Sequence, residues 1–249
     1  MDVAPVQDSK KIMDQKELSF ERVKSGIPGF DELVNGGMLR DSVVLLGGDA
    51  GTGKTVLSLQ FLYRGITDFN ENSMFISFAE SRESVYRTAL AFGWNFQQFE
   101  TQDKFLFVRY QPKDVMEIVA EGGGTLRDTI EAFNIRRVAI DPITAFALMF
   151  ESKYKEQQHL NDLFGLLHDL KCTTLVVSEE PARLEGYKTN RAEFLSDGII
   201  HLYSIHKDAT RVRAIEIIKM RDTAIRECVC PIKLDKDGLT VLSDQTINV

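Results

Sequence analysis

The most restrictive feature of the sequence is a glycine-rich segment, Gly48-Asp49-Ala50-Gly51-Thr52-Gly53-Lys54-Thr55, which matches the pattern G-x-x-x-x-G-K-[ST]. It follows an apolar stretch, Ser42 to Leu46, and precedes residues with helical spacing that continue toward Asp68. A strand, a glycine-rich loop and a helix in this order are the setting in which such a loop binds phosphates. The glycines allow backbone N–H groups to point inward around an anion. The segment therefore predicts a nucleotide site where a strand leads into a helix.

The end of this loop predicts individual contacts to a nucleotide. Lys54 would neutralise charge on the β- and γ-phosphates, and Thr55 would offer its hydroxyl to Mg²⁺. The helix that begins near Gly53 would present the positive end of its dipole to the phosphates. We therefore expect ATP and Mg²⁺ as ligands, bound through Gly48, Asp49, Ala50, Gly51, Thr52, Gly53, Lys54, Thr55 and Val56.

Apolar stretches alternate with segments of helical spacing as far as Val177, which predicts an α/β fold with a mainly parallel sheet covered on both faces. The expected strands are Ser42–Leu46, Ser73–Phe78, Lys104–Val108, Arg137–Ile140 and Thr173–Val177. After the helix that follows the loop, the expected helices are Glu83–Phe92, Val115–Phe133 with an interruption at Gly122-Gly123-Gly124, and Gln157–Lys171.

The pattern changes near the C-terminus. Gly198–Ile205 and Val212–Lys219 are predicted to be adjacent strands, and Pro231–Leu234 and Leu239–Leu242 a hairpin. These strands would extend one edge of the sheet. Residues 1–18 have mixed charge and no usable period, so we expect a flexible tail followed by a single domain over residues 19–249.

Composition narrows the functional classes. The net charge is −7, which gives no electrostatic help toward nucleic acid or an anionic membrane. No apolar run approaches the roughly 20 residues that span a bilayer, and the polar N-terminus does not resemble a signal peptide, so we expect a cytoplasmic protein. Cys172, Cys228 and Cys230 do not have the spacing of a disulfide framework or a zinc site, and we expect reduced packing residues.

Carboxylates follow two of the expected strands. Asp141 ends the strand Arg137–Ile140, at the sheet edge where the loop lies, and could bind Mg²⁺ through water; the alternative is a turn residue before Pro142. Glu80 follows the strand Ser73–Phe78 and is the best candidate for activating water near the γ-phosphate. The alternative for Glu80 is a charge at a helix N-terminus. Less favoured candidates for activating water are Glu179 and Glu180.

An ordered set of further motifs resembles the KaiC-related ATPases of the RecA-like superfamily, in the single-domain form common in archaea. The resemblance extends from about Val23 to Leu242. Beside the glycine-rich loop it rests on Gly29-Phe30-Asp31-Glu32-Leu33 with Gly36-Gly37, Gln60-Phe61-Leu62-Tyr63, Phe92-Gly93-Trp94, Asp141 with Thr144, Glu193-Phe194-Leu195-Ser196-Asp197-Gly198, and Lys219-Met220-Arg221.

The resemblance implies ATP sites between neighbouring subunits of a homo-oligomer, and we expect a hexameric ring. It implies that Lys219 and Arg221, with Met220 between them, reach the γ-phosphate bound to the adjacent subunit, and that Thr223 lies near the nucleotide. Without the resemblance, Lys219 and Arg221 would be two outward-facing charges on an edge strand. It further implies a regulatory output through partner proteins.

The sequence departs from the family pattern at two positions. KaiC-like proteins commonly carry two glutamates after the second strand, and here the first is Ala79, which leaves Glu80. Ile225 stands where a histidine near the γ-phosphate is common. We therefore expect slow hydrolysis. Because one ATPase domain is present, the autophosphorylation of the two-domain clock protein is not carried over.

Two alternative functions stay open at this point. RecA-like recombinases contact single-stranded DNA through the loop equivalent to residues 181–191, which here contains Arg183, Tyr187, Lys188 and Arg191. Nearby acidic residues offset the positive charge of this loop. A solvated loop is therefore the favoured interpretation, and nucleic-acid binding is the less favoured one. The other alternative, motivated by Ala79, is a nucleotide-binding scaffold without useful turnover.

Overall fold

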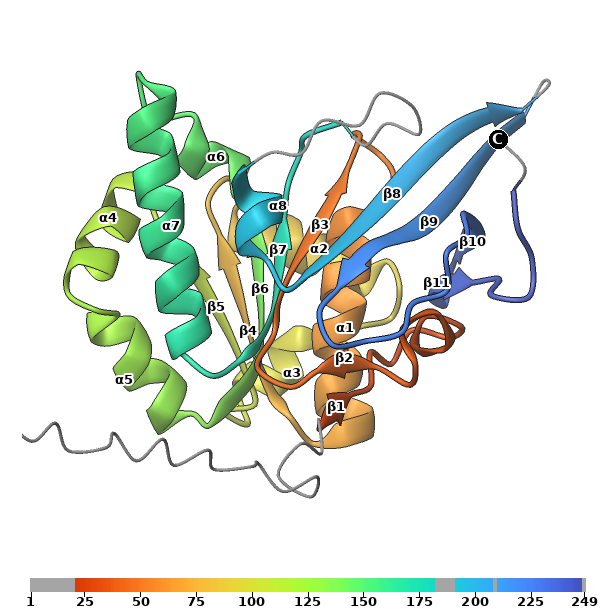
Figure 1. Cartoon of the computed structure of the whole chain (residues 1–249). Helices are drawn as coiled ribbons and strands as arrows, with labels where there is room; N and C mark the ends of the chain where they lie inside the picture. The colour runs from red at the N-terminus through yellow and green to blue at the C-terminus, as the bar shows by residue number, and fades with distance from the viewer. Residues whose placement is uncertain (1–20, 182–190, 208–209, 248–249) are drawn as a thin grey trace, which may run out of the picture.

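The computed structural model describes residues 21–181, 191–207 and 210–247, so the expected tail lies outside the described residues. Its centre is a nine-stranded sheet with the strand order β11-β10-β9-β8-β3-β7-β6-β4-β5 (Figure 1). The strands are β3 (Val43–Gly48), β4 (Asn72–Ser77), β5 (Phe105–Arg109), β6 (Ile135–Asp141), β7 (Thr173–Val177), β8 (Gly198–Lys207), β9 (Thr210–Met220), β10 (Cys230–Asp235) and β11 (Gly238–Val241).

Strand β3 lies in the middle of this sheet and is buried along its whole length. Its side chains alternate between two cores: Val44 and Leu46 belong to one, and Val43 and Leu45 to the other. It pairs in parallel with β7 and with β8. Burial on both faces is what a parallel sheet between two helix layers requires, and the predicted α/β fold is confirmed.

Helices cover both faces of the sheet (Figure 1). Residues of α1 (Lys54–Phe69), α2 (Arg82–Leu90) and α3 (Phe96–Glu100) belong to one core. Residues of α4 (Pro112–Ala120), α5 (Gly124–Ala132), α6 (Thr144–Ala147) and α7 (Lys153–Asp169) belong to the other, with α8 (Arg191–Leu195) beside α7. The predicted break at Gly122-Gly123-Gly124 is confirmed, since α4 and α5 are separate helices with Gly122 and Gly123 at φ values of 66° and 106°.

The C-terminal strands extend one edge of the sheet, as the sequence predicts. β8 pairs with β9, β9 with β10, and β10 with β11, all antiparallel. The β10–β11 hairpin is attached to α1 through buried Gln60, whose amide donates to the Leu239 carbonyl at 3.0 Å and accepts from the Leu239 N–H at 2.7 Å. The hairpin therefore has a fixed position beside the start of α1.

A buried arginine ties the N-terminal segment to this core. Arg137 on β6 is 1% exposed, and its Nε lies 2.6 Å from Glu71. Its two terminal nitrogens donate to the carbonyls of Phe61 and Lys24, at 3.0 and 2.9 Å. Lys24 adjoins β1 (Arg22–Val23), which pairs with β2 (Met38–Leu39), and the 3-10 helix η1 (Asp31–Val34) lies between them. Arg137 was expected only as the first residue of a strand.

Candidate functional site

The glycine-rich loop connects the carboxyl end of β3 to the start of α1, as predicted. Gly48, Gly51 and Gly53 have φ values of 149°, 77° and 107°, which favour glycine. At Gly48 an added Cβ would lie 2.4 Å from the Leu202 carbonyl oxygen, so the position also lacks room for a side chain. The path of the loop therefore favours glycine at all three positions through the φ values, and at Gly48 also through the lack of room.

Lys54 and Thr55 begin α1 and point toward different partners. The Lys54 ammonium donates to the carbonyls of Gly48 and Asp49, at 2.6 and 2.9 Å, so the lysine lies folded over its own loop. Burial lowers the pKa of Lys54, and the carboxylates of Asp141 and Glu179 oppose that shift. The Thr55 hydroxyl donates to the Asp141 carboxylate at 2.7 Å. The two residues predicted to hold Mg²⁺ are thus in direct contact.

Asp141 ends β6 and is 8% exposed. Burial raises the pKa of its carboxyl to about 6; the Thr55 hydrogen bond opposes this shift, and Glu80 and Glu179 add to it. A nearby cation would relieve these unfavourable interactions. In the described part of the chain, no three His, Cys, Asp or Glu side chains form a group that could hold a metal alone. Mg²⁺ keeps several waters and takes few protein ligands beside substrate phosphates.

Glu80 follows β4 and lines the same pocket as Asp141. Its carboxylate accepts a hydrogen bond from the Ser84 hydroxyl at 2.7 Å, and its carbonyl accepts from Ser77 at 2.9 Å. Ser81 is the N-cap of α2 and accepts from the Ser84 N–H. Glu80 therefore stands just before a helix and faces the pocket, so both interpretations of its position agree with the geometry.

Two further residues line the pocket: Glu179, a less favoured candidate from the sequence, and Leu234, which has no predicted role. Glu179 lines the same pocket as Glu80 and accepts from the Thr144 hydroxyl at 3.3 Å, whereas Glu180 lines a neighbouring small pocket. Leu234 of β10 also lines the pocket, an apolar side chain from the far end of the chain. Leu234 lies here because the hairpin packs on α1, and the residues next to Leu234 in the sequence do not predict that position.

The pocket has a volume of about 370 Å³ and lies at the carboxyl edge of the sheet. Its lining residues are Ala50, Gly51, Gly53, Lys54, Thr55, Val56, Ala79, Glu80, Asp141, Pro142, Glu179 and Leu234.

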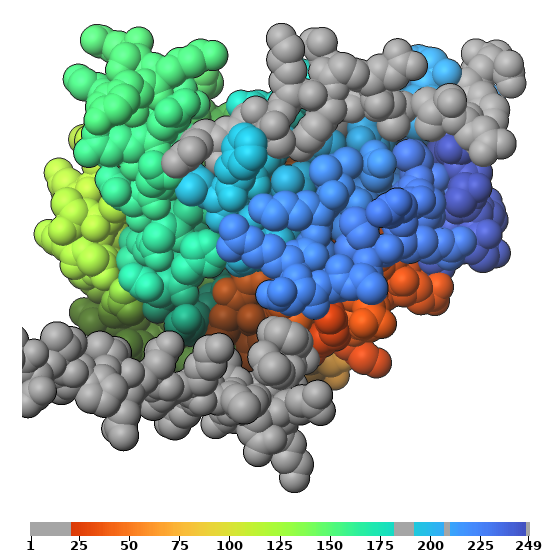
Figure 2. Space-filling model, in the orientation of Figure 1, coloured from red at the N-terminus to blue at the C-terminus, as the bar shows by residue number. Residues whose placement is uncertain are grey.

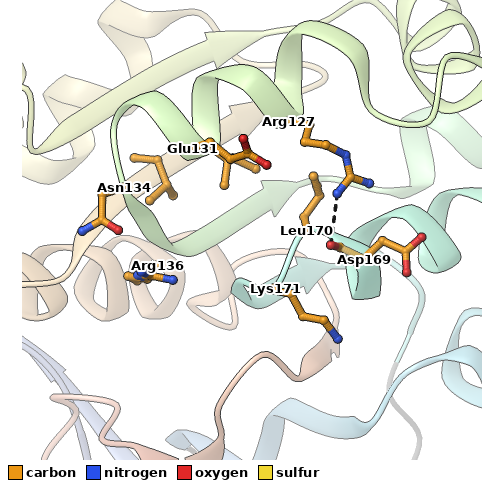
Figure 3. Close-up of a pocket in the computed structure, with 9 residues that line it drawn as sticks. Arg127, Glu131, Asn134, Arg136, Asp169, Leu170 and Lys171 are labelled. Atoms are coloured by element: carbon orange, nitrogen blue, oxygen red, sulfur yellow. Dashed lines mark hydrogen bonds between the residues drawn. The ribbon is translucent and has the colours of Figure 1, made fainter.

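A second pocket of about 320 Å³ lies at the other edge, where β6 begins (Figure 3). Arg127 points toward Asp169 there and donates to its carbonyl at 3.3 Å. None of its described lining residues was predicted to bind a ligand.

Lys219 and Arg221 lie away from this pocket. Strand register sets Gly48 opposite Leu202, and Val44 opposite Gly198, which in turn pairs with Met220. The end of β9 is therefore level with the start of β3, and the strand from Val44 to Gly48 spans about 13 Å. The beginning of β9 does reach the loop, since Arg213 donates to the Gly51 carbonyl at 3.2 Å.

Residues 219–223 have partners within their own chain. The Lys219 ammonium donates to the Ser196 carbonyl at 2.6 Å, and burial, then the neighbouring Arg221, lowers the pKa of Lys219. Arg221 lies 3.0 Å from Asp197. The Thr223 hydroxyl accepts from Arg22 at 3.1 Å. Met220 is 7% exposed and packs at Gly198, so its side chain faces the core.

Three other expectations concern regions outside the pocket. Residues 182–190, with Arg183, Tyr187 and Lys188, lie outside the described residues, as does the side chain of Arg191. The three cysteines are unbridged; Cys172 and Cys230 are buried, and the sulfurs of Cys228 and Cys230 are 2.7 Å apart. Within the described residues, every helix is too short or too polar to cross a bilayer.

Known proteins match nearly the whole chain. A family model described as "ATPase: KaiC" matches residues 23–246. A circadian clock oscillator protein KaiC from Prochlorococcus marinus is 31% identical over 94% of this chain and 47% of its own length. A UPF0273 protein from Sulfurisphaera tokodaii is 31% identical over 92% of this chain and 84% of its own length. The chain thus spans about half the length of the KaiC relatives it matches.

A solved structure agrees with these sequence matches. The crystal structure of a KaiC-like protein from Pyrococcus horikoshii superposes with a TM-score of 0.80 at 32% identity, covering 89% of this chain and 99% of the other. The single-domain form suggested by the motifs agrees with this match, because each of the two chains is covered over most of its length. With a RecA-like fold, a phosphate-binding loop in its expected setting and a family match over most of its length, the chain belongs to the KaiC family of ATPases.

Proposed function

We propose that the chain binds ATP with Mg²⁺ in the pocket at the carboxyl edge of β3 and hydrolyses it slowly. We further propose that it acts as a homo-oligomer, a hexameric ring, whose nucleotide state is sensed by partner proteins in the cytoplasm. The observation that carries ATP binding is the convergence of Lys54, the Thr55–Asp141 pair and Glu80 in one pocket.

Each residue of this convergence has a chemical task. Lys54 exchanges its bonds to the loop carbonyls for bonds to the β- and γ-phosphates. Thr55 and Asp141 hold Mg²⁺, Thr55 directly and Asp141 through water, and the ion neutralises charge on the phosphates. Leu234 provides an apolar surface in the pocket lining for the less polar part of the nucleotide.

We expect slow hydrolysis because few carboxylates in the pocket can activate water. Attack by water requires a base within hydrogen-bond reach of it. Glu80 is the only glutamate left of the usual pair, because Ala79 replaces the other, and it is already engaged by Ser84. Glu179 faces the same pocket and is the comparison residue for any test of Glu80.

The position of Lys219 and Arg221 supports sites shared between subunits. Both cations lie at the amino end of β3, about 13 Å of strand away from the loop of their own chain. The Arg221 side chain is 53% exposed. Figure 2 shows atoms of β9 and α8 on the same face of the molecule. A cation delivered from an adjacent subunit stabilises charge that develops on the γ-phosphate.

The experiment pairs sedimentation with phosphate release on one sample, with and without ATP and Mg²⁺. We expect ATP to favour a six-subunit species and phosphate release to be slow. An equal mixture of Lys54→Ala and Arg221→Ala subunits should recover activity at about a quarter of the interfaces of a head-to-tail ring. A monomer whose turnover is unchanged by Arg221→Ala would contradict the shared site, and binding without turnover would leave a nucleotide-binding scaffold.

A further inference from the structure

Asp197 connects three elements that meet at the amino end of β3. One carboxylate oxygen accepts from the backbone N–H of Val43 at 2.9 Å. The other accepts from the Arg221 guanidinium at 3.0 Å. His168 of α7 approaches the first oxygen, with its Nδ1 3.4 Å away. The carboxylate is 17% exposed, so these bonds are partly shielded from water.

Backbone hydrogen bonds fix Asp197 on both sides. Its N–H donates to the Val43 carbonyl at 2.8 Å, and its carbonyl accepts from the Arg221 N–H at 2.8 Å. The neighbouring Ser196 carbonyl holds the Lys219 ammonium. The segment that ends α8 and begins β8 thus holds both cations assigned to the adjacent subunit's nucleotide.

Among the described residues, the contact with Asp197 leaves most of the Arg221 guanidinium without a hydrogen-bond partner. A guanidinium has five N–H donors in a rigid plane, and the carboxylate takes a hydrogen bond from one terminal nitrogen. The arginine side chain remains 53% exposed. A long side chain tethered in this way has fewer conformations to lose when it meets an anion, which is how a positioning contact favours a transition state.

We propose that Asp197 positions Arg221 for the nucleotide bound to the neighbouring copy of the chain. This inference rests on the proposed shared site. In this role Asp197 acts through Arg221, and it joins that arginine to Val43, the first residue of the strand that leads to the loop of its own subunit. Asp197 therefore links the site that a subunit holds to the site that it completes.

The test is Asp197→Asn, because the asparagine oxygen can still accept from the Val43 N–H while the charge that faces Arg221 is lost. We expect about a tenfold drop in phosphate release, the size of effect given by loss of one charge-assisted hydrogen bond. Affinity for ADP should not change, since ADP lacks the γ-phosphate. Asp162→Asn, on the exposed side of α7, is the matched control and should behave as wild type.

Mixing experiments show which site Asp197 serves. An equal mixture of Asp197→Asn and Lys54→Ala subunits should recover activity like the Arg221→Ala and Lys54→Ala mixture, because intact loops then meet intact Asp197–Arg221 pairs. Asp197→Asn mixed with Arg221→Ala should recover none, because every subunit then has a defective arginine contact. If Asp197→Asn does not fold, Asp197→Ser replaces it, since the hydroxyl can also accept from Val43.

The outcomes separate this inference from the function on which it rests. If the Arg221→Ala and Lys54→Ala benchmark fails to recover, with mixed oligomers demonstrated, the shared site itself is wrong. If the benchmark recovers and the Asp197→Asn and Lys54→Ala mixture does not, the positioning role is wrong and the shared site stands. Unchanged turnover in Asp197→Asn alone would also overturn the positioning role.

Discussion

The two ends of β3 are built in different ways. At the carboxyl end, eight consecutive residues form the loop, and a few side chains from neighbouring strand ends complete the pocket. At the amino end, Asp197 gathers contacts from Val43, His168 and Arg221, which are far apart in the sequence. The first arrangement can bind a ligand within one chain. The second arrangement offers an exposed cation and, by our proposal, acts only on another chain.

The largest expected effect comes from Lys54→Ala at the carboxyl end of β3, and a comparison with Arg221→Ala at the amino end distinguishes the roles of the two ends. Lys54→Ala should lower ATP turnover by about a thousandfold and weaken binding of both ATP and ADP, because in the proposed site this lysine contacts the phosphates directly. Arg221→Ala should lower turnover while ADP binding stays intact. Fluorescent nucleotide titrations with phosphate release measure both. If both variants lost ADP affinity to the same degree, the proposal that the two ends of β3 have different roles at the nucleotide would be wrong.

A smaller effect tests which carboxylate at the carboxyl end activates water. Glu80→Gln should lower turnover by about a hundredfold, the range for loss of a general base, with ATP binding retained. Glu179→Gln is the matched variant, since Glu179 faces the same pocket, and it should have the weaker effect. A greater loss in Glu179→Gln, measured as single-turnover phosphate release, would transfer the role from Glu80 to Glu179.

The smallest expected effect is on stability and concerns Asp141. Its pKa is raised from 3.8 to about 6, so the folded chain binds more protons than the unfolded chain between these values. The ionised carboxylate therefore destabilises the fold as pH rises through this window, and the penalty is complete above about pH 6 at no more than about 3 kcal/mol. Asp141→Asn should be more stable than wild type at pH 7.5 without Mg²⁺.

Urea unfolding at several pH values measures this effect. The difference in unfolding free energy between Asp141→Asn and wild type should shrink as pH falls. It should vanish below about pH 4, where the Asp141 carboxyl is protonated and is therefore as neutral as the asparagine. Saturating Mg²⁺ with ADP should stabilise wild type more than the variant. A difference that does not depend on pH would mean that burial does not raise the pKa of Asp141 in solution.

Much of the fold could be predicted because its signals are local. The loop motif, the apolar strand before it and the helical spacing after it lie within one stretch of chain, and β3 and α1 form where expected. The helix break at Gly122-Gly123-Gly124 has the same origin, since consecutive glycines weaken a helix wherever the chain places them. Asp141 and Glu80 were found because parallel strands bring their carboxyl ends to one edge.

Residues with distant partners could not be predicted in this way. Arg137 carries no local sign that it will be buried, because Glu71, Phe61 and Lys24 satisfy its donors only after folding. Leu234 reaches the pocket through the docking of the hairpin on Gln60.

The sequence by itself determined the phosphate-binding loop, the alternation of strands and helices, and the family resemblance. These features depend on neighbouring residues and on fixed backbone periods. Only the tertiary structure decided that Lys219 and Arg221 lie at the opposite end of β3 from the loop, and that Asp197 holds Arg221 there. Strand register and side-chain contacts between distant segments set those positions, and both exist only once the sheet has formed.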